Sequence, residues 1–245
     1  MLLEQQIIFR PKKLPQQYVF KGRFPLTEYF FDFNIEGNSF QINVVHVQTV
    51  QPKGIVFFLH GTLNHIQYHL PKTDLFIENG YDVVMMDYPK YGKSKGVLTA
   101  PLLYKVVEST FLKVRDLLPP TTAWIIAGRS LGTALASNLA TKISAKGLIL
   151  ISPYYSMPDL FQHKVKLFTF NRLHFKLENF LYLPKVPCKS YILHGTKDKL
   201  IPISIAEKLI PFLKSPAHFF AIEYADHFNI HEMEAYKEKI RLILG

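Results

Sequence analysis

Short apolar runs recur along the chain, and longer stretches between them place apolar residues three or four positions apart. Two early runs, Tyr29–Phe33 and Phe40–Val47, flank Glu36-Gly37-Asn38, a turn sequence that predicts a β-hairpin. Later runs predict strands at Ile55–Leu59, Val83–Met86, Trp124–Ala127, Leu148–Ile151, Tyr191–Leu193 and Phe219–Tyr224. Five of these six are continuously apolar, which is typical of parallel strands buried on both faces. Residues 221–224 alternate instead, so the last strand is expected near a sheet edge.

Helical spacing occupies the intervals between the predicted strands. It is found over Tyr68–Glu78, Pro101–Leu118, Leu131–Ser144, Ile203–Leu213 and Ile230–Leu244. Alternating strands and helices favour an α/β fold, in which a mostly parallel sheet of about eight strands carries helices on both faces. The 245 residues contain no visible repeat and no linker, so a single domain over 1–245 is predicted. Residues 154–183, rich in Phe, Tyr and Leu, break the rhythm and are interpreted as a short lid or insertion.

Composition narrows the class of protein further. Apolar residues make up 48% of the chain and charged residues 20%, which excludes an intrinsically disordered or low-complexity protein. The single cysteine, Cys188, excludes an internal disulfide framework and a cysteine-rich metal site. Residues 1–13 contain no continuous apolar segment of the signal-peptide kind, and the longest apolar runs are only of strand length. A cytoplasmic protein without a metal or cofactor is therefore expected.

The formal net charge is +10, and it is unevenly distributed. Residues 1–25 carry five basic groups and one acidic group, and further surplus lies in 101–150 and 151–190. No Lys/Arg block of the kind that marks a nucleic-acid tail is present, so no nucleic-acid partner is predicted. Four basic residues fall on the expected lid, namely Lys164, Lys166, Arg172 and Lys176. They suggest the hypothesis that the lid steers acidic acyl substrates or contacts an anionic membrane surface.

The motif that carries chemistry follows the strand at Trp124–Ala127. The sequence Gly128-Arg129-Ser130-Leu131-Gly132 is a G-x-S-x-G between a predicted strand and a predicted helix, the context of a nucleophile elbow. In such a turn the serine adopts a strained backbone, and the flanking glycines let strand and helix approach closely. Ser130 is then the candidate nucleophile, and the N–H of Leu131 a candidate oxyanion donor. The alternative is an ordinary turn with a capping serine.

A serine nucleophile needs a base and an acid that orients the base. Asp198 lies in the loop after the strand at 191–193, and His227 follows the last strand directly. The chain order Ser130, Asp198, His227 is that of α/β-hydrolases. Asp226 is the competing acid, but as the neighbour of His227 it is poorly placed to reach the far ring nitrogen. In the loop after the strand at 55–59, the N–H of Thr62 is the candidate second oxyanion donor.

These motifs resemble the serine α/β-hydrolases, in particular the BEM46-like, serine-aminopeptidase-like (S33-type) branch, which also holds depalmitoylating enzymes. The resemblance covers residues 28–240 and includes His60-Gly61, the string from Asp87 to Gly96, and His194-Gly195-Thr196-Lys197-Asp198. It implies a hydrolase of carboxylic esters or thioesters that works through an acyl-serine intermediate on a small-molecule or acyl substrate. Two alternatives stay open: a serine peptidase with the same three residues, and a non-catalytic binding protein on this fold.

Overall fold

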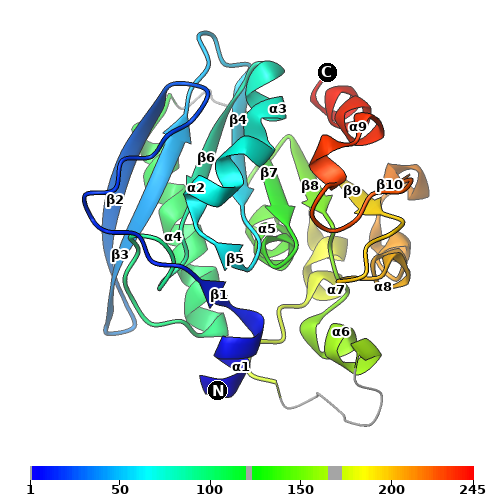
Figure 1. Ribbon diagram of the computed structural model, residues 1–245, viewed down its shortest axis with the longest axis horizontal. Helices are drawn as coiled ribbons and strands as arrows, with labels where there is room; N and C mark the ends of the chain where they lie inside the picture. Colours follow the sequence, from blue (N-terminus) through cyan, green and yellow to red (C-terminus); the bar gives the residue numbers. More distant parts are fainter. Residues whose placement is uncertain (1, 120–122, 165–172) are drawn as a thin grey trace. The chain divides into compact units, whose positions relative to one another are not determined.

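The computed structural model describes residues 2–119, 123–164 and 173–245 (Figure 1). The chain divides into two compact units, Met1–Trp124 and Ile125–Gly245, which are described separately below. The prediction of a single domain therefore stays a prediction. Within the described ranges, no helix combines the length and the apolar character that crossing a membrane requires.

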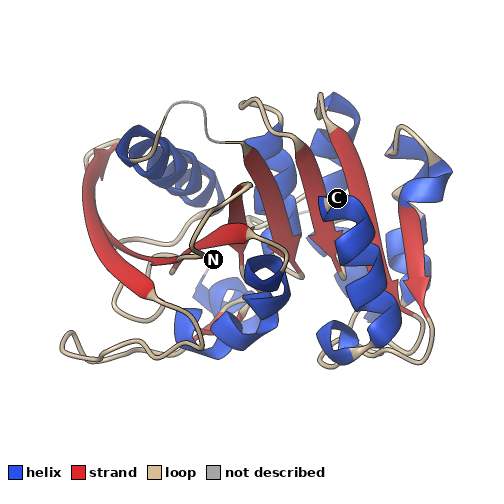
Figure 2. Ribbon diagram, turned by 90° about the horizontal axis from the view of Figure 1, so that it is seen from above, coloured by secondary structure: helices blue, strands red, loops and turns tan. Residues whose placement is uncertain are grey.

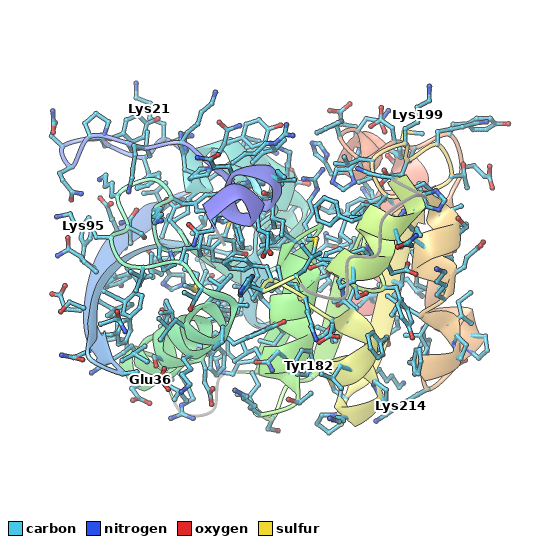
Figure 3. All side chains as sticks on the ribbon, turned by 90° about the horizontal axis from the view of Figure 1, so that it is seen from below. Lys21, Glu36, Lys95, Tyr182, Lys199 and Lys214 are labelled. Carbon is cyan, nitrogen blue, oxygen red and sulfur yellow. The ribbon has the colours of Figure 1, made fainter. Side chains whose placement is uncertain are left out.

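Four strands of the first unit form a sheet in the order β4, β6, β3, β2. Their bounds are β2 Leu26–Ile35, β3 Asn38–Val47, β4 Gly54–Leu59 and β6 Tyr81–Met86. β4 and β6 are parallel, whereas β3 runs antiparallel to both β6 and β2. The β2–β3 hairpin turns at Glu36 and Gly37 with φ of 52° and 72°, and the exposed Glu36 side chain lies at the periphery of the first unit (Figure 3). Every residue of β4 and β6 is buried, as their continuous apolar runs predict.

The first unit also contains elements that the hydrophobic pattern did not predict. They are helix α1 Leu2–Ile8 and the parallel pair of short strands β1 Arg10–Pro11 and β5 Leu63–Asn64. The helix expected over 68–78 is divided into α2 Ile66–His69, a 3-10 turn Leu70–Thr73 and α3 Asp74–Glu78. Pro71 lies in that turn, and because its ring removes an N–H donor a continuous helix cannot form there. Helix α4 Ala100–Leu117 matches its prediction.

The second unit arranges four parallel strands in the order β10, β9, β8, β7. Their bounds are β7 Trp124–Arg129, β8 Gly147–Ile151, β9 Lys189–Gly195 and β10 Phe219–Ile222. β7 and β8 are buried throughout, and β10 stands at the end of the order, so its predicted edge position is confirmed. Helices lie on both sides of these strands (Figure 2). With the four strands of the first unit, the predicted number of about eight is reached among the described residues.

Helices of the second unit are α5 Gly132–Ala140, α6 Met157–Lys164, α7 Asn179–Tyr182, α8 Ile203–Glu207 and α9 Glu234–Leu244. The helix expected over 203–213 ends early and is followed by a 3-10 turn, Ile210–Phe212, which contains Pro211. Short 3-10 turns also occupy Leu183–Lys185, Pro216–His218 and Ile230–Glu232.

The segment expected to form a lid, 154–183, contains α6 and α7. Residues 165–172, which include Lys166 and Arg172 of the proposed basic group, lie outside the described residues. Asn179 ties α7 to α5, since its amide nitrogen donates to Thr133 Oγ1 at 3.0 Å and its amide oxygen accepts from Ser137 Oγ at 2.9 Å. This buried contact fixes one end of the segment on the helix that follows the elbow.

Candidate active site

The predicted nucleophile elbow is present at the junction of β7 and α5. Ser130 stands between the end of β7 and the start of α5 with φ of 53°, a region that side-chain-bearing residues rarely occupy. A Cβ on Gly128 would lie 2.5 Å from the Gly132 carbonyl oxygen and 2.8 Å from the Ala136 Cβ. Only glycine therefore fits at 128, and the close approach of strand and helix is what forces the tight turn.

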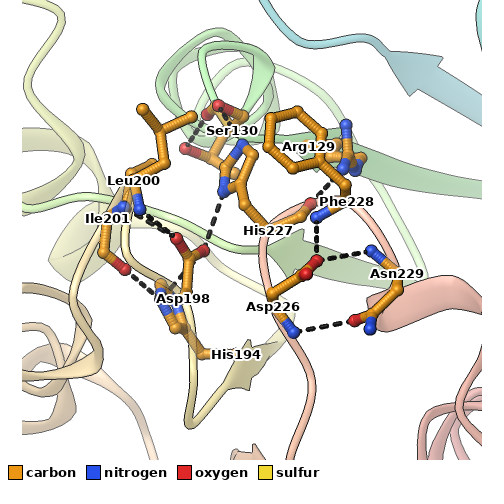
Figure 4. Close-up of polar contacts among 11 residues, drawn as sticks. Arg129, Ser130, His194, Asp198, Leu200, Ile201, Asp226, His227, Phe228 and Asn229 are labelled. Atoms are coloured by element: carbon orange, nitrogen blue, oxygen red, sulfur yellow. Dashed lines mark hydrogen bonds and ion pairs between the residues drawn. The ribbon is translucent and has the colours of Figure 1, made fainter.

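Ser130, Asp198 and His227 are brought together at the carboxyl ends of β7, β9 and β10 (Figure 4). The distance from His227 Nδ1 to Asp198 Oδ2 is 2.7 Å, and from His227 Nε2 to Ser130 Oγ it is 3.1 Å. All three residues are at most 6% exposed. With the proton on Nδ1 donated to the carboxylate, Nε2 is free to accept the serine proton.

Asp198 is held as an ionised acceptor. Its Oδ1 accepts hydrogen bonds from the main-chain N–H groups of Leu200 at 2.9 Å and Ile201 at 2.8 Å, while Oδ2 faces His227. Burial acts to raise the pKa of Asp198, but the hydrogen bond and charge of His227 and the Ile201 N–H outweigh it, so the pKa lies below its ordinary value. The carboxylate therefore stays charged at neutral pH.

The competing acid, Asp226, has a different task. Its Oδ1 accepts from the main-chain N–H groups of Phe228 at 2.7 Å and Asn229 at 2.8 Å, and its own N–H donates to Asn229 Oδ1 at 2.7 Å. These reciprocal bonds shape the loop that presents His227. The carboxylate that faces the imidazole ring is that of Asp198, which is the arrangement expected from the sequence.

His194 is a buried neighbour of this group to which the sequence analysis gave no role. Its Nε2 donates to the Ile201 carbonyl at 2.8 Å and lies 3.6 Å from Asp198 Oδ2. His194 thus braces the loop that carries Asp198. Burial lowers the pKa of His194 below 6.5, with the Ile201 and Asp198 oxygens acting in the opposite direction. The ring is therefore neutral at pH 7.

The depressed pKa of His194 predicts that the fold loses stability on acidification. The unfolded side chain binds a proton near pH 6.5, whereas the folded one does so only at lower pH. Its contribution is therefore complete above pH 6.5 and declines as the pH falls toward the folded pKa. We expect urea unfolding at about pH 5.5 and about pH 7.5 to show a smaller pH difference in His194→Gln than in the parent chain. Equal differences in both proteins would contradict this.

The two candidate oxyanion donors lie in different units. Leu131 directly precedes α5, so its N–H belongs to the first turn, where N–H groups have no partner within the helix. Thr62 lies in the loop after β4 and is firmly held within the first unit. Its carbonyl accepts from Tyr91 Oη at 2.8 Å and from the Arg10 N–H at 3.1 Å, and its hydroxyl donates to the Ile8 carbonyl. The role of the Thr62 N–H stays a prediction.

The string from Asp87 to Gly96 forms the support of that loop. Tyr88 Oη donates to the His60 carbonyl at 2.7 Å, and Asp87 Oδ1 accepts from the Ile66 N–H at 3.0 Å. Ser94 Oγ donates to the Asp87 carbonyl at 2.8 Å. These contacts give Asp87 and Ser94 structural roles, and they explain why the string lies beside the loop of Thr62. Among the described residues, no cluster of three His, Cys, Asp or Glu side chains could hold a metal ion.

Comparisons with known proteins find a matching family and several relatives. A family model described as "Serine aminopeptidase, S33" matches residues 50–182. Human alpha/beta hydrolase domain-containing protein 17B is 28% identical over 163 residues, which make up 65% of this chain and 55% of the human protein. The uncharacterized protein YfhR of Escherichia coli is 25% identical over 195 residues, 76% of this chain and 68% of YfhR. The chain thus spans about half the length of the human relative that it matches.

Solved structures extend the likeness to nearly the whole chain. An esterase of Pyrococcus furiosus superposes with a TM-score of 0.73 at 15% identity and covers 97% of both chains. The thioesterase domain from the curacin biosynthetic pathway gives a TM-score of 0.63 at 16% identity, covering 90% of this chain and 100% of the domain. At such low identities these likenesses concern the fold.

Strand, elbow and helix, together with these likenesses, define a protein of the α/β-hydrolase class. More narrowly, the chain belongs to the serine aminopeptidase S33 family, whose model matches more than half of it. The fold class and the family resemblance predicted from the sequence are both confirmed.

Proposed function

We propose that the protein is a serine hydrolase that cleaves carboxylic esters or thioesters through an acyl-Ser130 intermediate. The observation that carries this function is the hydrogen-bonded chain from Ser130 Oγ through the His227 ring to Asp198, with distances of 3.1 and 2.7 Å. A serine hydroxyl is a weak nucleophile on its own, and this chain supplies the base and the acid that orients it.

In the acylation step, Ser130 Oγ attacks the substrate carbonyl while its proton passes to His227 Nε2. Asp198 stabilises the imidazolium that forms, because its carboxylate accepts from Nδ1. The carbonyl carbon becomes tetrahedral, and its oxygen gains negative charge beside the Leu131 N–H at the start of α5. His227 then gives its proton to the departing alcohol or thiol, and the acyl group stays on Ser130.

Deacylation reverses the roles with water as the nucleophile. His227 takes a proton from the water, whose oxygen attacks the acyl carbon, and the proton returns to Ser130 Oγ as the acid is released. No step requires a group beyond the three side chains and the main-chain donors. The esterase and thioesterase names of two structural neighbours support this reaction class.

A peptidase is the second candidate, because the family carries the name of an aminopeptidase. A peptidase of that kind needs a carboxylate to hold the substrate amine. Asp159 and Glu178 do line one open groove of the second unit, together with Tyr155 and Phe180. However, Asp159 Oδ1 already pairs with Lys208 Nζ at 2.5 Å. That ion pair occupies one oxygen of the carboxylate, Oδ1, and offsets its charge, which favours the esterase.

A panel of substrates distinguishes an esterase or thioesterase from a peptidase. The purified chain is treated with a fluorophosphonate probe and then offered p-nitrophenyl esters and acyl thioesters of increasing chain length, and aminoacyl p-nitroanilides. We expect labelling and turnover of esters or thioesters, with little turnover of anilides. Absence of labelling would overturn the serine-hydrolase proposal, whereas labelling with anilide turnover alone would favour the peptidase.

A further inference from the structure

Arg129 directly precedes the candidate nucleophile, yet its side chain reaches the loop that carries the candidate base. Its Nη2 donates to the main-chain carbonyl oxygen of His227, a residue 98 positions further along the chain (Figure 4). Arg129 is only 5% exposed. Burial of a guanidinium that stays charged at every accessible pH is costly, so a charged donor at this place needs good acceptors.

The loop around His227 is anchored at two further points. The Ala225 carbonyl accepts from the Lys197 N–H at 2.9 Å, which joins the start of the loop to the segment after β9. Asp226 and Asn229 then close a tight turn through their reciprocal hydrogen bonds. The contact from Arg129 differs from both, because it is made to the peptide group of the base itself and is charge-assisted.

Arg129 therefore links both ends of the reacting pair. Its main chain is bonded to Ser130, and its side chain holds the carbonyl of His227. Ser130 Oγ and His227 Nε2 lie 3.1 Å apart. Arg129 is joined covalently to Ser130 and by a hydrogen bond to His227, so it connects the two residues that carry these atoms. A misplacement of about 1 Å between reacting groups can cost about 100-fold in rate.

From this geometry we infer that Arg129 is a positioning residue, which holds the His227 main chain so that the imidazole stays within proton-transfer distance of Ser130. This role presupposes the serine-hydrolase activity proposed above. It assigns a task to the variable position of the G-x-S-x-G motif, for which the motif itself specifies no residue type.

A purely structural role is the competing explanation. Tyr236 of α9 is buried, which raises the pKa of its phenol well above the usual range, and the positive charge of Arg129 acts in the opposite direction. The charge of the guanidinium therefore acts on a residue of α9 as well as on the His227 carbonyl. Loss of this charge would then lower stability without a selective effect on the chemical step. The test therefore measures both the rate of the reaction and the local stability of the loop around His227.

Replacement of the guanidinium tests the positioning role. For Arg129→Met, which keeps length but not charge or donors, we expect kcat toward p-nitrophenyl acetate to fall about 30- to 100-fold with KM changed less than about threefold. Arg129→Lys, which keeps one charged donor but not the planar fork, should recover part of the loss, to within about tenfold of the parent. Arg241→Met is the matched control, because Arg241 is a half-exposed arginine of α9 that pairs with Glu234; it should leave kcat unchanged.

Hydrogen exchange supplies a readout that does not need activity. In Arg129→Met we expect faster amide exchange in a peptide covering 225–229, with exchange in β8 and β9 unchanged. Faster exchange spread over the whole unit, or a loss in kcat that Arg129→Lys does not reduce, would show a structural role and overturn the inference. If the parent chain itself neither labels nor turns over esters, the proposed function fails, and exchange at 225–229 still decides whether Arg129 fixes the loop. Should Arg129→Met fail to fold, Arg129→Lys gives the same two readouts.

Discussion

Ser130→Ala is expected to abolish ester turnover and fluorophosphonate labelling. Removal of Oγ takes away the atom that forms the acyl intermediate, and no neighbouring hydroxyl can replace it at 3.1 Å from His227 Nε2 within the described residues. In serine hydrolases with this arrangement, loss of the nucleophile lowers kcat by about 10⁴- to 10⁶-fold. Rates with p-nitrophenyl acetate, corrected for the spontaneous reaction, measure the effect.

The chain offers a close control for this substitution. Ser152 follows β8, is fully buried and has φ of 50°, so it shares the strained backbone of Ser130 at the end of a neighbouring strand. Ser152→Ala should retain labelling and activity within a few-fold. Labelling that survives in Ser130→Ala would identify a different nucleophile, and loss of labelling in both variants would point to disruption of the strand ends rather than of the chemistry.

The sequence predicted the central strands because they combine two independent signals. Runs such as 55–59 and 148–151 are continuously apolar and bounded by glycine or polar residues, and both are buried in full. The hairpin was predictable because Gly37 accepts positive φ freely, although Glu36 beside it also adopts a positive φ, which is uncommon for a residue with a side chain. Strands β1 and β5 could not be predicted, because each is only two residues long and so shows no alternation of apolar and polar positions. Each is defined only by its pairing with the other.

Helix ends were predicted less well than helices. Spacing of apolar residues continues through Pro71 and Pro211, although the turn at Pro71 buries Leu70 and Thr73 whereas the turn at Pro211 buries no residue fully. The proline ring then decides the local hydrogen bonding, which hydrophobic periodicity does not register. The expected helices over 68–78 and 203–213 were therefore too long.

The candidate site shows the same division between what the sequence encodes locally and what folding brings together. Ser130 was recognisable because it lies in a G-x-S-x-G sequence whose residue 128 must be glycine for steric reasons, and Asp198 and His227 because each follows a strand. The contacts of Arg129 and His194 were not recognisable. Nothing in the sequence indicates that a guanidinium will meet a carbonyl 98 residues away.

Asp198→Asn is expected to lower kcat by about 10⁴-fold, while the fold and the positions of the three side chains are retained. The reason lies in the two oxygens of this carboxylate. Oδ1 accepts two main-chain N–H groups, from Leu200 and Ile201, so the amide oxygen of asparagine must occupy that position. The amide NH₂ then faces His227 Nδ1, which has to become an acceptor. The ring proton moves to Nε2, and Nε2 can no longer take the proton of Ser130.

Asp226→Asn separates this effect from a general loss of negative charge near His227. Its carboxylate also accepts two main-chain N–H groups through one oxygen, Oδ1, and asparagine keeps that oxygen. The loop should therefore hold, with kcat within about threefold of the parent, because amide and carboxylate oxygens cap such turns comparably. A large loss in Asp226→Asn with near-normal activity in Asp198→Asn would reverse the two assignments. Since the pair shares side-chain chemistry and differs in which atom faces the ring, the ratio of the two kcat values measures the contribution of the His227–Asp198 contact.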